Sequence, residues 1–574
     1  AYVAARVISA DDVAATALLV EMAGREQLGL APEPLAWVAM GLALRTPRDG
    51  HTCVVLSEID AWAGAIEADG VEPASHGSLH WPASVASWKT ALQSAGPLVG
   101  TPGERAPFIL DGDRLYVARS LHEEQEIARR LSGAVAGHVE ILLGGPGTGK
   151  TTTVAKRLIE LFQADPHTRI ALAAPTGKAA ARMAEALRNR LHDPNAPEEV
   201  RAAGAAARAA VEAARPVTVH KLLGNRPQGT PRYRFNANNP LAYDLVVVDE
   251  ASMLSSSLMF HLLAALSADT RLLLVGDPDQ LASVDAGSVL ADLAKAAEPS
   301  AAPLAARTTK LTVRHRFGRR IGGLADAILA ADVDAALAIL DGTQPLSAPA
   351  PAAAPAAATA TAADDPAAVC WVAPHTADFK AVVDAAVAHA RRLQELAASG
   401  DVAAALELQK ALQVLCGHRE GPLGVAGWNA VVERRLGVAG GSPWYAGRPV
   451  LVTRNNPALD LFNGDIGLIV PGAERGRMDA VFPTGREPRR VPVSRLEDVA
   501  TVHALTIHKS QGSEYRHVVV ILPERPSRIV TRELLYTGVT RAIEKVTVVG
   551  SRDVIADAIR RPIRRATGLA GRLG

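Results

Sequence analysis

The sequence predicts an α/β fold with two parallel sheets, because apolar strand-like runs alternate with amphipathic helical segments along most of the chain. Four runs stand out in the first half, at residues 139–145, 169–177, 244–252 and 271–280. Continuous Val and Leu runs are typical of strands buried on both faces by helices. A second region of the same kind begins at residue 369. Each run ends in Gly or polar residues, and ligands bind at the carboxyl ends of strands in such sheets.

Composition excludes several classes of protein. The chain has 574 residues, enough for several domains, and a formal net charge of +1. A nucleic-acid site must therefore be a local basic groove. The three cysteines are widely spaced, which gives no metal or disulfide pattern and favours a reducing compartment. We find no signal peptide and no apolar run of about 18 residues, so we expect no membrane partner.

The chain divides into four stretches by composition. Residues 1–118 are helix-like and contain several Trp, but they carry no chemical motif. Residues 119–345 form the first α/β region, and residues 369–574 form the second. Between them, residues 346–368 are rich in Ala and Pro, and we expect a low-complexity linker without a core.

Each α/β region contains an insertion with a different composition. Residues 225–241 are rich in Pro, Asn and Arg, and we expect a protruding hairpin there. Residues 443–500 are short-stranded and rich in turns, and they include Asn463 and Gly464, a strong hairpin signal. We expect this second insertion to be a small β-barrel.

The stretch "GGPGTGKT" fits the phosphate-binding pattern G-x-x-x-x-G-K-[ST], placed after a strand and before a helix. Backbone N–H groups of such a loop wrap phosphates, and the helix N-terminus adds positive potential. Lys150 would reach the β- and γ-phosphates of ATP, and Thr151 would bind Mg²⁺. A plain Gly-rich turn is the alternative. The residues predicted to hold the nucleotide are Gly144, Gly145, Pro146, Gly147, Thr148, Gly149, Lys150, Thr151 and Thr152.

Two later strands end in residues suited to hydrolysis. "LVVVDEAS" supplies Asp249, which can hold Mg²⁺ through water, and Glu250, which can orient and deprotonate the attacking water. "LVGDPDQL" supplies Gln280, whose amide both donates and accepts hydrogen bonds and suits a sensor of the γ-phosphate. The alternatives are an exposed carboxylate pair and an ordinary turn, respectively.

Two arginines are candidates for stabilising the transferring phosphoryl group. Arg316 lies in "VRHRFG", and Arg541 lies in "ELLYTGVTRA" before the last strand-like run. For either arginine alone, a solvated surface charge is the better explanation. Together they belong to the part of the chain that can close on a nucleotide held by the first region, as arginine fingers do.

The ordered set of motifs resembles that of superfamily 1 helicases: "GGPGTGKT", "APTGKAA", "TVHKLLG", "VVVDEASM", "VGDPDQL", "RHRF", "LTIHKSQGSEY" and "LLYTGVTRA". "TVHKLLG" and "HKSQGSE" are most similar to the branch that moves 5′→3′, and within it to the RecD family. The resemblance covers residues 119–345 and 369–551. It implies two RecA-like domains, with a hairpin (1B) inserted in the first and an SH3-like barrel (2B) in the second.

The resemblance also assigns roles that the residues alone do not. Gln125 would read the adenine, and Gly512 and Glu514 would face the nucleotide and the domain interface. Small polar groups and one Lys suit contacts to the DNA backbone without sequence readout. The DNA contacts implied are Pro175, Thr176, Gly177, Lys178, Thr218 and His220 in the first domain, and Thr506 and His508 in the second.

By resemblance, the chain would be an ATP- and Mg²⁺-dependent 5′→3′ single-stranded DNA translocase and helicase. It would act with RecB-like and RecC-like subunits of an exodeoxyribonuclease V (RecBCD) complex on DNA ends, in double-strand break repair and recombination. The location would be the bacterial cytoplasm, with the nucleoid. Residues 1–118 lack a helix–hairpin–helix element and would dock on a partner. The sequence carries no nuclease constellation.

Other interpretations remain open from sequence. The N-terminal region can have its own core and no partner. The chain can be a stand-alone DNA helicase, which would unwind DNA well as a purified monomer. It can also be an RNA remodeller, since phosphate contacts barely distinguish the two backbones. A non-enzymatic subunit with a helicase fold is disfavoured by intact Lys150, Glu250, Gln280 and Arg541.

Overall fold

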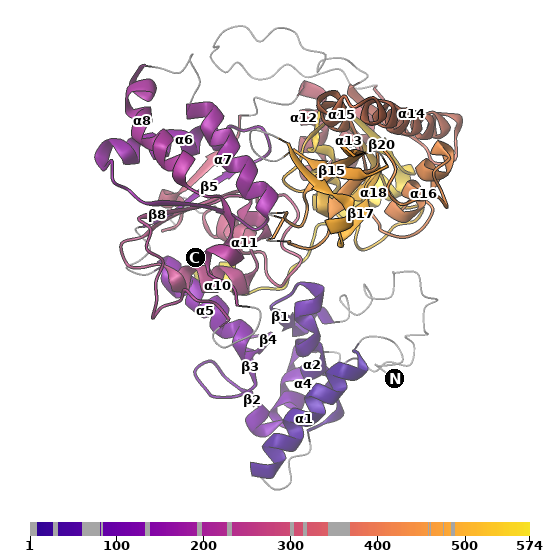
Figure 1. Ribbon diagram of the computed structural model, residues 1–574. Helices are drawn as coiled ribbons and strands as arrows, with labels where there is room; N and C mark the ends of the chain where they lie inside the picture. The colour runs from indigo at the N-terminus through magenta and orange to yellow at the C-terminus, as the bar shows by residue number, and fades with distance from the viewer. Residues whose placement is uncertain are drawn as a thin grey trace.

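Four sheets organise the chain, and Figure 1 shows the parts that they build. The computed structural model describes residues 8–26, 32–59, 81, 84–132, 138–191, 198–226, 232–298, 303–313, 318–342, 368–456, 458–459, 461–474, 476–483 and 488–573. The N-terminal part lies below two α/β domains that stand side by side (Figure 1). No helix in the described ranges is long and apolar enough to cross a membrane. The three cysteines are free thiols.

The N-terminal part combines helices with a small sheet. The helices are expected, but the four-stranded sheet of order β1-β4-β3-β2 is not. Its strands are two to four residues long, too short to show alternation in the sequence. The elements are α1 (Ala10–Glu26), α2 (Pro34–Arg45), β1 (Cys53–Val55), α4 (Val85–Gln93), β2 (Val99–Gly100), β3 (Phe108–Asp111) and β4 (Arg114–Val117).

The first α/β domain has a six-stranded parallel sheet of order β10-β5-β9-β8-β6-β7. The strands are β5 (Val139–Gly144), β6 (Ile170–Ala174), β7 (Val217–Thr218), β8 (Leu245–Val248), β9 (Arg271–Gly276) and β10 (Thr308–Leu311). The helices are α5 (Ala118–Ser132), α6 (Lys150–Ala164), α7 (Gly177–Leu191), α8 (Glu198–Ala213), α9 (Val219–Leu222), α10 (Ser256–Ala265) and α11 (Val289–Ala296). Separate apolar cores lie on its two faces, as the continuous Val and Leu runs predict.

The register of this sheet brings three functional loops together. Leu143 of β5 pairs with Gly276 of β9, and Val248 of β8 pairs with Leu274 of β9. The carboxyl ends of these three strands are therefore neighbours. The loops that follow them carry the phosphate-loop motif, the Asp-Glu pair and the Gln280 motif.

The second α/β domain has a five-stranded parallel sheet of order β11-β20-β19-β12-β18. The strands are β11 (Val369–Val372), β12 (Leu412–Cys416), β18 (Ala504–Thr506), β19 (Tyr515–Ile521) and β20 (Ala542–Val549). The helices that follow strands of this domain are α14 (Ala377–Ser399), α15 (Val402–Gln409), α16 (Val425–Leu436), α17 (Arg532–Val539) and α18 (Arg552–Arg560).

The boundary between the two domains differs from the one expected at residue 345. Helices α12 (Arg319–Leu329) and α13 (Val333–Leu340) pack on the core of the second sheet, against α17 and α18. Their apolar faces fit the second domain, although they precede the low-complexity stretch. The sequence places that stretch at a boundary, but the packing partners of amphipathic helices are set by tertiary structure. Of residues 346–368, only Ala368 lies within the described residues.

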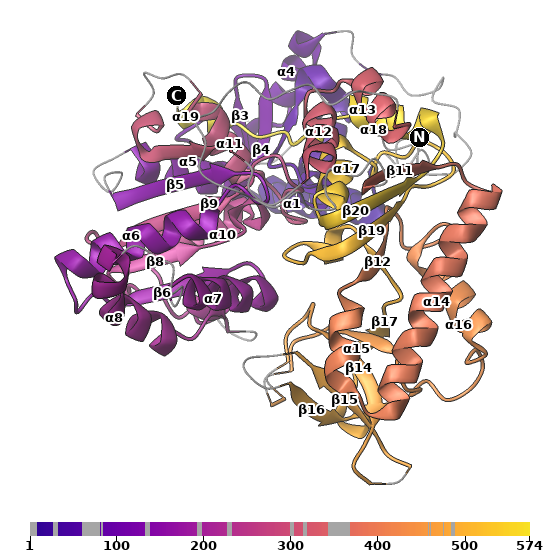
Figure 2. The same ribbon diagram turned by 90° about the horizontal axis from the view of Figure 1, so that it is seen from above.

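The insertion in the second domain is a five-stranded antiparallel sheet of order β16-β15-β14-β13-β17, slightly offset from the expected 443–500. It lies apart from the parallel sheet, beside α14 and α15 (Figure 2). Closure of this sheet into an SH3-like barrel stays a prediction. The strands are β13 (Pro449–Val452), β14 (Ile466–Pro471), β15 (Met478–Phe482), β16 (Arg489–Pro492) and β17 (Val499–Thr501).

The expected hairpin at 225–241 is seen only at its base. Asn225 bridges Tyr233 in antiparallel fashion, and Arg226 N donates to Arg232 O at 2.9 Å. The tip, residues 227–231, lies outside the described residues.

The C-terminal segment returns from the second domain to the first. After α18, the chain runs to α19 (Leu569–Leu573), which packs on α5 and α11. Leu569 and Leu573 join the core of the first sheet. Figure 1 shows the C-terminus beside α5, α10 and α11, although those helices lie much earlier in the sequence.

Candidate nucleotide and DNA sites

The phosphate-loop motif forms the turn between β5 and α6. Gly147 and Gly149 have φ of 77° and 86°, a region that favours glycine. A Cβ at Gly144 would lie 2.4 Å from Thr148 Oγ1, so this position also requires glycine. Lys150 Nζ donates to Gly144 O at 2.6 Å and to Gly145 O at 3.0 Å. The ammonium group is therefore held against the loop backbone.

The other residues of the loop line the same turn. Pro146 and Thr148 are buried, and Thr148 Oγ1 donates to Gly145 O at 2.8 Å. Thr151 and Thr152 are half-buried in the first turn of α6, where backbone N–H groups are free of helical partners. The loop thus presents a helix N-terminus and one lysine, which is the arrangement that binds phosphates.

Asp249 and Glu250 follow β8 directly beside the phosphate loop. Burial raises the pKa of Asp249, and the neighbouring Glu250 charge raises it further, while Lys150 lowers it. Glu250 N donates to Asp249 Oδ1 at 2.9 Å. The backbone of Glu250 has φ of 52° and ψ of 40°, a left-handed conformation that is uncommon outside glycine. This conformation turns the chain sharply between the two carboxylates.

Mg²⁺ fits this donor set by its chemistry. Thr151 offers a hydroxyl and Asp249 a carboxylate, and Mg²⁺ prefers such hard oxygen ligands together with substrate phosphates. A buried carboxylate whose pKa is raised by desolvation is stabilised when a cation approaches it. Within the described ranges, no group of three or more His, Cys, Asp or Glu side chains is placed to hold a metal alone.

Gln280 and Arg541 meet across the boundary between the two domains. Arg541 Nη2 donates to Gln280 Oε1 at 3.1 Å, and Gln280 Nε2 donates to Asp277 Oδ2 at 2.9 Å. Tyr536 OH donates to the same Asp277 oxygen at 3.1 Å. Arg541 is 2% exposed and Gln280 is 4% exposed, so this chain of bonds is shielded from water. Burial raises the pKa of Asp277, and Lys150 lowers it.

The same loop of the first domain carries further bonds to the second. Leu281 N donates to Thr537 Oγ1 at 3.1 Å, and Gln511 Nε2 donates to Leu281 O at 3.1 Å. Arg541 Nη1 also donates to Ser513 O at 3.4 Å. The loop after β9 is therefore fastened to both α17 and the "HKSQGSE" stretch.

Arg182 of α7 makes a second link between the domains. Its Nη2 lies 2.5 Å from Glu514 Oε2, and its Nη1 donates to Gly512 O at 2.9 Å. Burial lowers the pKa of Arg182, but the charge and hydrogen bond of Glu514, followed by the charges of Glu250 and Asp249, raise it overall. Gly512 and Glu514, expected at the nucleotide and the interface, thus contact a cation beside the Asp-Glu pair.

Three residues of this interface escaped the sequence analysis: Asp277, Tyr536 and Arg182. Asp277 stands at a strand end, as Asp249 does, and that position was a usable signal. Tyr536 is 1% exposed and lies in α17 among buried residues, where its sequence indicates packing and not a polar contact. Arg182 sits on a helix that is rich in Ala and Arg, where no pattern distinguishes one arginine from another.

The expected DNA contacts at residues 175–178 lie against the loop between β13 and β14 of the inserted sheet. Thr176 Oγ1 accepts from Ala179 N at 3.2 Å at the start of α7. Phe462 lies against Gly177, where a Cβ would come within 2.8 Å of it. Lys178 is half-buried, and desolvation lowers its pKa to about 8, opposed by Asp465. Pro175, also half-buried, precedes them. The sequence did not predict this contact.

The remaining DNA candidates are partly buried. Thr218 caps α9 by accepting from Lys221 N at 3.2 Å. Burial lowers the pKa of His220, with Arg232 contributing. In the second domain, Thr506 ends β18 and accepts from Lys509 N at 3.3 Å. Desolvation lowers the pKa of His508, and Arg565 lowers it further. In both histidines, burial therefore favours the neutral form.

One predicted residue is not brought to the nucleotide site, and one is not described. Gln125 is exposed on α5 and lines a shallow hollow with Arg129, Ser132 and Arg572. Its role with adenine stays a prediction. Arg316 lies outside the described residues.

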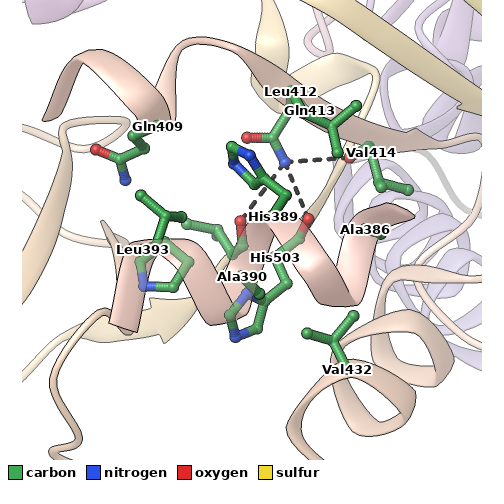
Figure 3. Close-up of a pocket in the computed structure, with 12 residues that line it drawn as sticks. Ala386, His389, Ala390, Leu393, Gln409, Leu412, Gln413, Val414, Val432 and His503 are labelled. Carbon is green, nitrogen blue, oxygen red and sulfur yellow. Dashed lines mark hydrogen bonds between the residues drawn. The ribbon is translucent and has the colours of Figure 1, made fainter. Parts of the chain in front are cut away.

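A separate buried hollow lies within the second domain, between α14, α16 and β12 (Figure 3). Gln413 Nε2 donates to Val414 O and His503 O at 3.2 Å and 3.3 Å. Burial lowers the pKa of His389 to about 4 and that of His503 to about 3. The hollow includes none of the predicted site residues, so we regard it as structural.

Three family models match the chain. They are an AAA domain at residues 125–286, a UvrD-like helicase C-terminal domain at 501–549 and the N-terminal domain of RecBCD enzyme subunit RecD at 4–116. Two parallel sheets joined through Gln280 and Arg541, with a phosphate loop at the edge of the first, define a superfamily 1 helicase, an ATP-driven DNA-unwinding enzyme.

Similar whole chains identify the family. The chain is 41% identical to RecBCD enzyme subunit RecD of Mycolicibacterium smegmatis, over 95% of each protein. It is 38% identical to RecD of Mycobacterium tuberculosis H37Rv, over 100% of this chain and 96% of that one. The chain therefore belongs to the family of RecBCD enzyme RecD subunits.

More distant relatives share part of the chain. The ATP-dependent RecD2 DNA helicase of Deinococcus radiodurans is 32% identical over 75% of this chain, but over only 49% of its own length. A Bacteroides Pif1 helicase bound to ADP-AlF3 and single-stranded DNA aligns with a TM-score of 0.37 and 15% identity, over 74% of this chain and 91% of that chain. That likeness is too distant to support an argument.

Proposed function

We propose that this chain is the 5′→3′ DNA-translocating subunit of a RecBCD-type helicase–nuclease. It works with RecB-like and RecC-like subunits on DNA ends, in double-strand break repair and recombination in the bacterial cytoplasm. The observation that carries the motor assignment is the buried bond between Arg541 and Gln280. This bond joins the second domain, which would separate from the nucleotide, to the first domain, which would hold it.

In this proposal, the chain's own residues divide the work of hydrolysis. The phosphate loop and Lys150 bind the β- and γ-phosphates, and Thr151 and Asp249 hold Mg²⁺, which would neutralise charge on those phosphates. Glu250 orients the attacking water and accepts its proton. Arg541 stabilises the charge that develops on the transferring phosphoryl group.

Movement along DNA follows from the bonds that cross the domain interface. ATP between the domains favours their closure through Gln280, Arg541 and Arg182, and hydrolysis removes the γ-phosphate that these groups sense. The "HKSQGSE" stretch carries both the DNA-side His508 and the interface residues Gln511 and Glu514. Opening and closing thus shift one DNA grip relative to the other.

The partner role rests on the N-terminal part and on the relatives. The relatives in mycobacteria are RecBCD subunits by name, and residues 4–116 match a domain particular to RecD. Helix α1 exposes Leu18 at 58% and Met22 at 56%, one helical turn apart. Exposed apolar residues at this spacing suit a protein partner. Cutting of DNA would belong to that partner.

A polarity assay tests the proposal. We expect the purified chain to hydrolyse ATP faster with oligo(dT) and to unwind, only weakly without its partner subunits, a duplex carrying a 5′ single-stranded tail. Efficient unwinding by the chain alone would favour a stand-alone helicase. A duplex with a 3′ tail is the matched control and should stay paired. Preference for the 3′ tail would contradict the polarity, and stimulation by oligo(U) alone would favour an RNA-directed enzyme.

A further inference from the structure

The loop at residues 277–287, which follows β9, contacts every part of the chain that would move during the ATP cycle. Its first half bonds to Tyr536, Thr537, Arg541 and Gln511 of the second domain. Its second half turns toward the N-terminal part and the C-terminal segment. Gly287 N donates to Gly50 O at 3.0 Å. The loop therefore connects the γ-phosphate sensor to a distant contact outside both RecA-like domains.

Arg565 lies where these parts meet. Its Nη2 donates to Ser283 O at 2.8 Å, in the middle of the 277–287 loop. The same guanidinium packs against Gly50, where an ideal Cβ would fall 1.0 Å from Nη1. Gly50 has φ of 80°, which already favours glycine. The next residue along, Ala566, donates its N–H to His51 Nδ1 at 2.9 Å and accepts from Thr52 N at 2.9 Å.

The predicted DNA grip of the second domain reaches the same loop, because Gln511, which follows His508 in the "HKSQGSE" stretch, donates to Leu281 O at 3.1 Å. Burial lowers the pKa of His508 and that of His51, and the charge of Arg565 lowers each further. Arg565 itself is buried enough for desolvation to lower its own pKa. One guanidinium therefore lies among the sensor loop, the DNA-side histidine and the N-terminal part.

The remainder of the C-terminal segment fixes Arg565 in this place. Ile563 N donates to Glu533 Oε2 at 2.7 Å on the second domain. Thr567 Oγ1 donates to Asp292 at 3.0 Å on α11 of the first domain. Gly568 N donates to Glu124 at 3.1 Å, and Leu569 enters the core of the first sheet. The segment contacts both domains, and Arg565 lies between these contacts in the chain.

We propose that Arg565 is a positioning residue that couples DNA binding at His508, and the state of the N-terminal part, to the γ-phosphate sensor Gln280 through the 277–287 loop. This inference rests on the proposed function. Displacing the guanidinium frees Ser283 O and the second half of the loop, whereas the phosphate loop and the Asp-Glu pair are untouched. The residue acts through the loop and contacts neither nucleotide nor reacting atoms.

The physical reason for coupling is the number of bonds that share the one loop. A shift of the N-terminal part moves Gly50, and with it Arg565 and the Ser283 carbonyl. A packed loop held at both ends has few alternative arrangements, so it passes such a shift on rather than absorbing it. A protein bound to the N-terminal part can in this way set the ATP hydrolysis rate of the motor.

Two variants test the role from opposite sides. Arg565→Met removes the guanidinium but keeps the apolar stem, which limits loss of packing. Gly50→Ala leaves Arg565 in place but forces the guanidinium away. Gly103→Ala is the control for backbone strain, because Gly103 lies in the same N-terminal part with φ of 98° and nothing within 4 Å of its ideal Cβ.

We expect Arg565→Met and Gly50→Ala each to lower the oligo(dT)-stimulated rate of ATP hydrolysis by about tenfold, with basal hydrolysis and ATP affinity unchanged. Gly103→Ala should keep the full stimulation. In a chain that already carries Arg565→Met, Gly50→Ala should lower the stimulated rate of ATP hydrolysis no more than Gly103→Ala does. The unaltered chain is measured first, because lack of stimulation there would refute the proposed function instead.

Several outcomes would overturn the inference. Full stimulation in Arg565→Met would do so, as would equal losses of basal and stimulated hydrolysis. Additive losses from Gly50→Ala and Arg565→Met would show that Gly50 acts by another route. Thermal unfolding of every variant is followed by circular dichroism, and a variant that unfolds early is replaced by Arg565→Lys, which keeps the charge but cannot span both Gly50 and the Ser283 carbonyl.

Discussion

The two RecA-like domains share an architecture but present opposite ends of their sheets to the nucleotide site. The first domain uses the carboxyl ends of β5, β8 and β9, which lead into the phosphate loop, the Asp-Glu pair and Asp277. The second uses the residues just before its strands. Ser513 and Glu514 directly precede β19, and Arg541 directly precedes β20.

This difference separates binding from sensing. Carboxyl ends of parallel strands, with helix N-termini behind them, are suited to hold an anion. The amino ends of parallel strands have no helix N-terminus behind them. In the second domain they supply one arginine and backbone carbonyls instead. In the proposed mechanism, one domain would hold the phosphates in a formed cradle, and the other would contact them only when the domains close.

The largest expected effect would break this division outright. Lys150→Ala should abolish ATP binding and hydrolysis together, because it removes the positive charge that would bind the β- and γ-phosphates. Arg541→Ala should keep ATP affinity and lower the turnover number by about 10³-fold, the usual worth of an arginine finger. Equilibrium binding of a fluorescent ATP analogue and steady-state hydrolysis separate the two. Equal losses of binding and turnover in Arg541→Ala would place both domains in binding.

A smaller effect would sharpen the account of the interface. Arg182→Ala removes the link to Glu514 and Gly512 and leaves the phosphate loop intact. We expect a decrease of about tenfold in stimulated ATP hydrolysis, since one partly buried, charge-assisted bond across the domain closure is lost. Arg188→Ala on the same helix is the control. If both variants lose activity alike, the effect comes from α7 itself.

The smallest expected effect is a loss of stability of the second domain at low pH. Its source would be His389, which lines the buried hollow. His389 has a folded pKa of about 4 and an unfolded value of about 6.5. Its folded pKa is depressed, so the neutral form is favoured in the folded state, and stability is lost as pH falls below the unfolded value.

The size of that loss can be measured by substitution. Between pH 7 and pH 5, His389→Gln should lose about 2 kcal/mol less of the free energy of unfolding than the unaltered chain does. Hydrogen exchange of the amides in β12 and β18 reports this domain. His167→Gln, at an exposed position, should behave like the unaltered chain. A pH response in His389→Gln equal to that of the unaltered chain would remove His389 as its source.

Sequence patterns predicted the first domain better than the second. Gly144 to Thr151 follow from a motif whose steric logic is local, and the structure shows the same logic in the contact between Gly144 and Thr148. Asp249 and Gln280 follow from strand ends. By contrast, Arg541 and Glu514 precede strands, where no local rule assigns chemistry. Arg541 was a candidate only together with Arg316, and Glu514 was placed by resemblance alone.

Contacts between distant segments were beyond any local pattern. Arg182 and Arg565 resemble many other arginines in this chain until folding brings them beside Glu514 and Gly50. The packing of α12 and α13 on the second sheet was missed for the same reason. An amphipathic helix shows that it has a buried face, but not which sheet will cover that face.

The left-handed backbone of Glu250 sets stability against activity at a single position. A side chain in this conformation costs roughly 1 kcal/mol relative to glycine. In the proposed mechanism, the chemistry of the carboxylate is what keeps a glutamate there. Laboratory evolution that rewards heat resistance alone should therefore drift toward Gly or Asn at residue 250 and yield a sturdier, inert protein. Evolution that rewards turnover should keep the strained glutamate and seek its stability elsewhere.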